Sequence, residues 1–161
     1  MLKQTDPAFD RLILGDSRLP VKEYGCLFTS LINAYCIYKK VPEKNQKQTF
    51  LELFRLFETK NGFNSNGLVV WNVVQQQFNL RRYLKFTQNY IKLMGIDSIS
   101  IDDTPQTFWI IELDKLTYTH FCNIVGKKGD QLFYFDVYDG VTKEINTKDK
   151  SILSIREIEF Y

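Results

Sequence analysis

The sequence predicts an α+β domain in which helices come first and an antiparallel sheet follows. Between residues 26 and 80, apolar residues recur every three or four positions, the spacing of one face of a helix. Beyond residue 80 the pattern changes mainly to period two and is rich in β-branched and aromatic residues, which favours strands. Helices followed by antiparallel strands indicate an α+β arrangement and not a doubly wound parallel sheet.

Residues 1–25 are predicted to form an extended, turn-rich arm, because Asp-Pro, Gly-Asp and Leu-Pro pairs interrupt them. A first helix is expected over 26–39, with Pro42 marking its end. A second helix is expected over 48–57, closed by an Asn-Gly pair. A third follows an Asn-Ser-Asn-Gly loop and covers 68–78.

The second half of the chain, 81–161, is expected to be mainly antiparallel sheet. Four runs of β-branched and aromatic residues predict strands at 107–113, 120–125, 131–137 and 152–160. Turn signals separate them, among them Lys-Gly-Asp at 128–130 and Asp-Gly at 139–140.

Length and composition limit the class of protein. A chain of 161 residues suits one domain spanning 1–161, and 44% hydrophobic with 25% charged residues is typical of a soluble globular chain. The net charge of only +2 gives no electrostatic argument for nucleic acid or membrane as a partner. The amino terminus lacks an apolar segment and no run approaches about 18 apolar residues, so neither a signal peptide nor a membrane span is expected.

The chain has three Cys and a single His, His120. The three Cys form no CxxC pair and leave one over after any pairing, so free thiols are expected instead of a zinc ribbon or a disulfide framework. One His excludes HExxH zinc hydrolases. The adjacent Asp102 and Asp103 have diverging side chains and no third carboxylate at ligand spacing. The sequence therefore predicts no metal and no cofactor.

Three residues form a candidate nucleophilic site. Cys26 follows Gly25 where a turn becomes a helix, and the unpaired amides and dipole of a helix start favour a thiolate. His120 begins one strand and Asp136 ends the next strand of a hairpin, so the two are expected to be neighbours. Cys122 shares the facing direction of His120 and is the candidate auxiliary thiol. A lone Cys at a helix start is more often a small packed residue, and from spacing alone a surface His and a turn-capping Asp remain as open as the functional interpretation.

Several blocks of sequence resemble one family. They are Gln-Thr-Asp-Pro-Ala-Phe at 4–9, Leu-Gly at 14–15, Tyr-Gly-Cys-Leu-Phe-Thr-Ser at 24–30, His-Phe at 120–121, Gly-Lys-Lys-Gly-Asp at 126–130 and Asp-Val-Tyr-Asp-Gly at 136–140. In content and order these blocks resemble the cysteine peptidase family 39-like domains, papain-like proteins related to the bacteriocin-processing, double-glycine peptidases. Phe9 stands where a tryptophan is common, and Val137 where a proline often follows the aspartate.

The resemblance implies a papain-like fold with Cys26 as nucleophile. It also implies His120 as general base and acid, Asp136 as the group that orients the imidazole, and Gln4 as a side-chain oxyanion donor beside the Cys26 amide. Gln4 also has an ordinary interpretation, an exposed polar residue near a chain end.

The function implied is a cysteine-dependent hydrolase that cleaves peptide or isopeptide bonds through a thioester. The stand-alone form resembles domains of bacteriophage lysis and virion proteins, which points to bacterial cell-wall peptides; protein processing, as in transporter-linked members, stays open. A phage origin would place the protein in the cytoplasm or the virion, where it would join virion assembly. Two alternatives remain: a catalytically silent papain-like structural or binding module, and acyl transfer to an amine.

Overall fold

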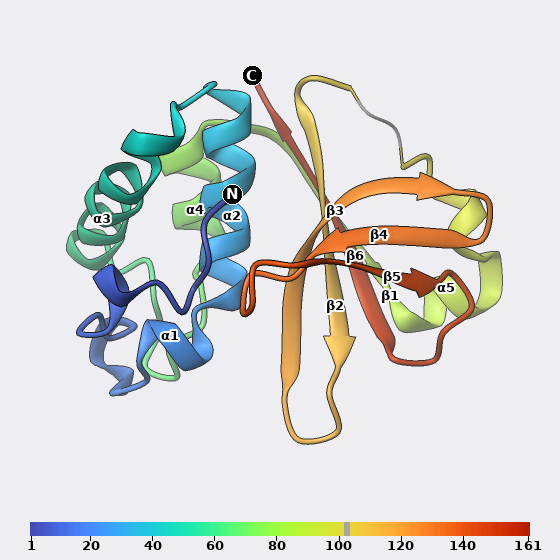
Figure 1. Ribbon diagram of the computed structural model, residues 1–161, viewed down its shortest axis with the longest axis horizontal. Coiled ribbons are helices and arrows are strands. Elements are labelled where there is room, and N and C mark those ends of the chain that lie inside the picture. Colours follow the sequence, from blue (N-terminus) through green and yellow to red (C-terminus); the bar gives the residue numbers. More distant parts are fainter. Residues whose placement is uncertain (102–103) are drawn as a thin grey trace.

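The computed structural model describes residues 1–101 and 104–161. Helices α1 to α4, within residues 21–78, gather on one side of the sheet, while the short helix α5, Gln88–Met94, lies on the other side, as Figure 1 shows. The expected α+β class is therefore confirmed. Asp102 and Asp103, weighed above as a metal site, lie outside the described residues.

The amino-terminal arm is more helical than expected. It contains 3-10 turns at Pro7–Phe9 and Gly15–Ser17 and the short helix α1, Val21–Tyr24. The prediction of an extended arm was wrong here, because segments of three or four residues are too short to show an apolar period. The arm is held to the domain by buried Phe9, whose ring stacks on that of Phe50 with centroids 4.0 Å apart.

Three longer helices follow. They are α2 (Cys26–Tyr38), α3 (Glu43–Thr59) and α4 (Trp71–Phe78). α3 begins five residues earlier than the apolar pattern indicated, because its first turns are polar and exposed while Pro42 occupies the N-cap. α4 begins three residues late, since Val69 instead forms a β-bridge with Phe63.

Phe28 fixes the start of α2 against α3. Its buried ring lies edge-on to those of Phe57 and Phe50, with centroids 5.0 and 5.4 Å away. Burying a side chain of this size stabilises a fold by about 1.5–3 kcal/mol. Because Phe28 is two residues after Cys26, this aromatic packing holds the first turn of α2 in place.

The strands form one antiparallel sheet in the order β1-β6-β2-β3-β4-β5. Their bounds are β1 Leu80–Thr87, β2 Thr107–Asp114, β3 Thr119–Lys128, β4 Gln131–Phe135, β5 Thr142–Asn146 and β6 Ile152–Phe160. The four predicted strands correspond to β2, β3, β4 and β6. The sequence did not single out β1 and β5, which lie at the sheet edges and carry a mixed, polar pattern.

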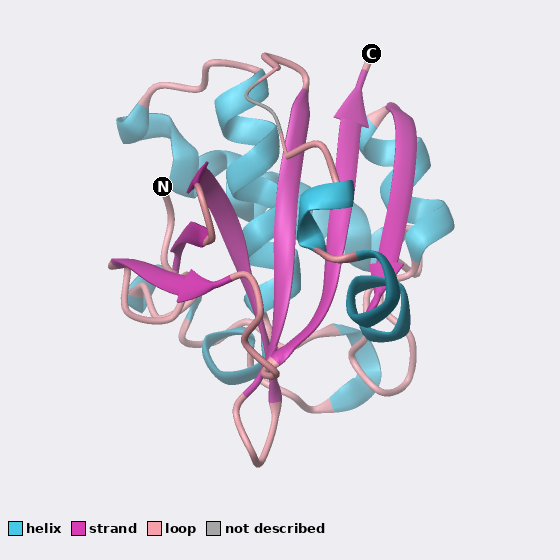
Figure 2. Ribbon diagram, turned by 90° about the vertical axis from the view of Figure 1, so that its right-hand side faces the viewer, coloured by secondary structure: helices cyan, strands magenta, loops and turns pink. Residues whose placement is uncertain are grey.

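Apolar clusters lie on both faces of the sheet. One joins Ile110, Ile158 and Phe160 to the long helices, and the other gathers Trp109, Ile111 and neighbouring residues under the short helix α5, Gln88–Met94. Figure 2 shows the sheet from the side of α5, with the long helices behind it. None of the helices in the described part of the chain is long and apolar enough to cross a membrane.

Candidate active site

Cys26 opens α2 and lies against the sheet. Gly25 occupies the N-cap, and Cys26 packs with Phe135, Val137 and the half-buried Phe121. The first amides of a helix have no partner in the preceding turn, so they are free to bind negative charge. The predicted helix start at Cys26 is confirmed, and it places a thiol beside the strands that carry His120 and Asp136.

His120 and Asp136 come together through the pairing of β3 and β4. Asn123 lies opposite Phe135 in this antiparallel pair, so the start of β3 lies beside the end of β4. His120 Nε2 lies 2.6 Å from Asp136 Oδ1, and both side chains are buried. Because a carboxylate only accepts, Nε2 donates the proton and Nδ1 is the nitrogen left for another partner.

The pairing of His120 with Asp136 shifts the pKa of both groups. Burial opposes a charge on the imidazole, but the hydrogen bond to Asp136 and contacts with the Cys122 and Cys26 thiols outweigh it and raise the pKa of His120 well above its ordinary value. Burial likewise opposes the charge of Asp136, yet hydrogen bonds from His120, Lys143 and the Tyr138 amide hold its pKa well below its usual range. Both shifts share one cause, the hydrogen bond between the His120 imidazole and the Asp136 carboxylate.

Lys143 is the part of the site that the sequence reasoning missed. It lies on β5, and its Nζ is 2.7 Å from Asp136 Oδ2 and 2.5 Å from Asp139 Oδ2. The Asp-rich turn at 136–140 could have indicated it. Such a turn places the next strand alongside β4, so a residue shortly after the turn lies near Asp136.

Gln4 is buried, not exposed at a frayed end. Its backbone N–H donates to Val137 O at 2.7 Å, and its side-chain Nε2 donates to Lys22 O at 3.1 Å. The bond to a carbonyl fixes which end of the amide carries the hydrogens. Since Nε2 has two hydrogens, one remains for a ligand in the cleft that Gln4 lines together with Cys26.

A cleft of ≈ 530 Å³ runs past Cys26 and His120. Apolar and aromatic side chains dominate its described lining, and Tyr24, Leu68, Tyr118 and Tyr138 are among the most exposed large side chains of the described chain. Glu23 is the one carboxylate among the described lining residues, which include no Lys or Arg. An exposed apolar groove with few charges is typical of a binding site.

Cys122 borders the site as the strand alternation predicted. It is completely buried, and ligand atoms of His120, Cys122 and Asp136 all lie within 4.8 Å of one another. Burial raises the pKa of the Cys122 thiol, although its contact with His120 opposes the shift. Cys36 is also buried, as expected from its place on α2, and burial raises its pKa to about 11.

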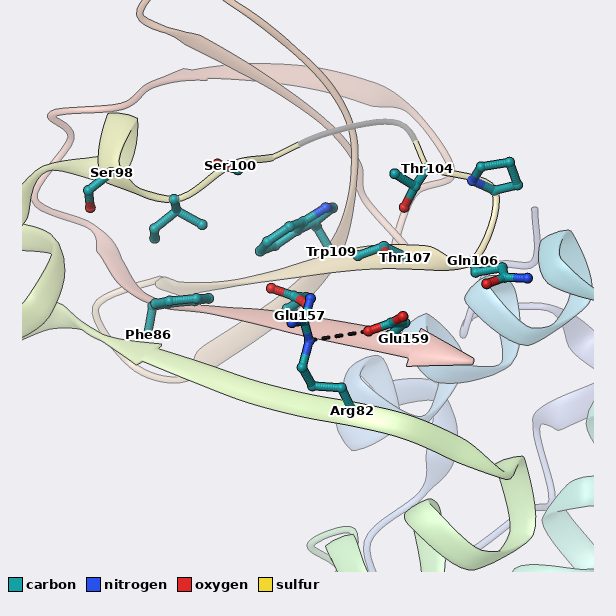
Figure 3. A pocket seen from close by; sticks show the side chains of 12 residues that line it. Arg82, Phe86, Ser98, Ser100, Thr104, Gln106, Thr107, Trp109, Glu157 and Glu159 are labelled. Carbon is teal, nitrogen blue, oxygen red and sulfur yellow. Dashed lines mark ion pairs between the residues drawn. The ribbon is translucent and has the colours of Figure 1, made fainter. Parts of the chain in front are cut away.

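A second cavity, of ≈ 510 Å³, lies on the α5 face of the sheet (Figure 3). Arg82 reaches across it to Glu157 and Glu159, beside Trp109 and Phe86. The described residues that line it include neither Cys nor His. The nucleophile and base predicted from the sequence therefore belong to the first cleft.

Comparisons with protein-family models, with curated proteins and with solved structures found no match for this chain.

Proposed function

We propose that this protein is a papain-like cysteine peptidase. The observation that carries the proposal is the His120–Asp136 pair at 2.6 Å, with His120 lining the same cleft as Cys26 at the start of α2. A nucleophile, a base beside it and a third group that orients the base are the parts that nucleophilic catalysis requires.

The proposed reaction begins when His120 Nδ1 takes the proton of the Cys26 thiol and the sulfur attacks the carbonyl carbon of a peptide or isopeptide bond. The Cys26 amide and Gln4 Nε2 hold the negative charge that develops on the carbonyl oxygen. His120 Nδ1 then gives its proton to the leaving amine, and a thioester remains on Cys26. A water molecule, whose proton passes to His120, attacks the thioester and releases the acid.

Asp136 and Lys143 act on His120 and not on the substrate. Asp136 fixes which imidazole nitrogen faces the thiol and balances the charge of the imidazolium, while Lys143 holds the second oxygen of the carboxylate. Both are positioning residues in this mechanism.

The substrate class rests on the resemblance and on the cleft. The described lining is apolar and aromatic with one carboxylate, Glu23, which suits an uncharged or amine-bearing peptide. Cell-wall peptides are the substrate class that the resemblance implies. Protein processing would use the same residues. The two functions are distinguished by which substrate is cleaved.

The test is alkylation with a limiting amount of a thiol-reactive, peptide-like probe at neutral pH, with mass spectrometry to locate the label. We expect Cys26 to react faster than a free model thiol such as glutathione, and His120→Ala to slow it by about 10²-fold or more. The model thiol is the necessary reference, since Cys36 and Cys122 are buried and would react slowly in any case.

A Cys26 that reacts no faster than glutathione, or that is indifferent to His120→Ala, would contradict the proposal and favour the catalytically silent module. If Cys26 is activated, adding amine acceptors with the substrate distinguishes hydrolysis from acyl transfer by the product that forms.

A further inference from the structure

The buried side of the candidate active site holds a second group of donors. His120 and Cys122 lie two residues apart on β3, and Asp136 follows β4. Their ligand atoms lie within 4.8 Å of one another, and the three side chains are almost completely buried. Catalysis as proposed uses His120 and Asp136, but it gives Cys122 no role.

The donors are one imidazole nitrogen, one thiolate sulfur and one carboxylate oxygen. Hard ions such as Mg²⁺ and Ca²⁺ select oxygen ligands, whereas a mixed nitrogen, sulfur and oxygen set suits Zn²⁺. One thiolate and one carboxylate bring two negative charges to the ion, and the cation Lys143, which lies beside Asp136, also pairs with Asp139.

We propose that His120, Cys122 and Asp136 form an inhibitory Zn²⁺ site within the candidate active site. The binding of the ion stands on the three donors alone; its inhibitory effect rests on the proposed peptidase function.

The geometry needs only a small adjustment. Zn²⁺ binds nitrogen and oxygen at about 2.0–2.2 Å and sulfur at about 2.3 Å, so tetrahedral ligands lie about 3.3–3.6 Å apart. His120 Nε2 and Asp136 Oδ1 must therefore move apart from their present 2.6 Å, and Cys122 Sγ must move inward. His120 also lines the cleft, which gives the ion a path from solvent.

The bound ion would stop the proposed chemistry at the imidazole. Zn²⁺ takes the place of the proton between His120 Nε2 and Asp136, so the base loses the group that orients it. The fourth coordination position is left for water.

The binding test uses Co²⁺ as an optical probe for the Zn²⁺ site. The full chain, first stripped of metal with a chelator, is titrated with Co²⁺ under reducing conditions while thiolate-to-cobalt absorption is followed. We expect one equivalent of Co²⁺ to give this absorption in the wild type and in Cys26→Ser, and Zn²⁺ to remove it by competition. Cys122→Ala should lose it, and the matched buried variant Cys36→Ala should keep it.

Three results would overturn the site: no thiolate absorption in the wild type, the same absorption in Cys122→Ala, or its loss in Cys26→Ser. If Cys122→Ala does not fold, Asp136→Asn decides instead, because it keeps the thiol and removes the carboxylate. We expect Asp136→Asn to weaken Co²⁺ binding at least tenfold, and an unchanged affinity would exclude Asp136 as a ligand.

Inhibition is measured separately, as the rate of Cys26 alkylation with and without Zn²⁺. We expect Zn²⁺ to slow the wild type at least tenfold, a chelator to restore it, and Cys122→Ala to be unaffected at the same Zn²⁺ concentration. Equal slowing in both proteins would show that Zn²⁺ acts on Cys26 directly. If Cys26 proves unreactive in every sample, the peptidase proposal fails while the Co²⁺ titration still decides the metal site.

Discussion

Lys143 holds one oxygen of Asp136 while His120 holds the other. Lys143 Nζ is 2.7 Å from Oδ2 and His120 Nε2 is 2.6 Å from Oδ1, so the carboxylate is fixed from both sides. Burial works against the charge of Lys143, but its bonds to Asp136 and Asp139 raise its pKa above its ordinary value, so it remains a cation. The rotation of the Asp136 side chain is thus set by a residue on a third strand.

Replacing Lys143 by Met should therefore disturb the base without touching the thiol. The buried Asp136 loses a charged donor, and its remaining bonds fix its rotation less firmly. We expect Cys26 alkylation to slow about tenfold in Lys143→Met, and Lys143→Arg to recover most of the rate because the guanidinium can still donate to Asp136. Lys148→Met, at an exposed ion pair with Asp130, serves as the matched control. A Lys143→Met protein labelled as fast as the wild type would remove Lys143 from the site.

Gln4 makes a prediction that separates two reactions of the same thiol. Alkylation of Cys26 develops no charge on a carbonyl oxygen, whereas peptide hydrolysis does. We expect Gln4→Ala to lower kcat for hydrolysis by about 10²-fold, the usual cost of losing one oxyanion donor, and to leave the alkylation rate within about twofold of the wild type. A parallel fall in both rates would assign the Gln4 side chain a structural role through its bond to Lys22 O instead.

Gly25 is required by space at the N-cap of α2. A Cβ at this position would lie 2.6 Å from Val21 O and 2.7 Å from Val21 Cγ1, and the carbonyl is backbone that cannot move aside cheaply. We expect Gly25→Ala to lower the free energy of unfolding by about 1–3 kcal/mol in denaturant titrations. Gly126→Ala is the matched control, because a Cβ there meets nothing within 4 Å. Equal stabilities of the two variants would contradict the steric argument.

The arm that carries Gln4 is pinned by a pH-sensitive contact. Asp6 accepts from the Ala8 amide and pairs with Lys47 on α3 at 2.8 Å. Burial opposes its charge, but these bonds prevail and lower the pKa of Asp6 below its ordinary value. Its stabilising effect is therefore complete above the unfolded pKa of about 3.9 and is lost as the pH falls through the lower folded value.

Asp6→Asn should consequently reduce the free energy of unfolding by about 0.5–1 kcal/mol at pH 7. The stabilities of the wild type and the variant should converge as the pH falls below the folded pKa of Asp6, where both side chains are uncharged. Asp10→Asn, at an exposed neighbour, is the control. A stability difference that stays constant with pH would show that the carboxylate charge contributes nothing.

Much of the fold could be predicted from local periodicity. The apolar faces of α2, α3 and α4 and the β-branched runs of β2, β3, β4 and β6 each carry their own signal. β1 and β5 do not, because an edge strand pairs on one side only and tolerates charges such as those of Arg82 and Lys143. The turns of the arm were missed since their stability comes from contacts such as Phe9 on Phe50, which lie far away in the chain.

Some parts of the candidate site could likewise be predicted from local pattern, and one part could not. The approach of His120 to Asp136 followed from a hairpin, and the shared direction of His120 and Cys122 followed from strand alternation. The contact between Cys26 and His120 is different, because it joins a helix to a sheet and no local pattern contains it. Only the resemblance to known peptidases brought these two residues together before the structure did.

Cys26 and His120 lie on separate layers, and the two residues are synthesised at different times. The thiol belongs to a helix made early in synthesis, while its base lies on a strand that emerges only after most of the chain, and the carboxylate follows later still. A partly synthesised or clipped chain that ends before β3 contains Cys26 without His120. Any chemistry that needs Cys26, His120 and Asp136 together can therefore begin only after β3 and β4 have been made.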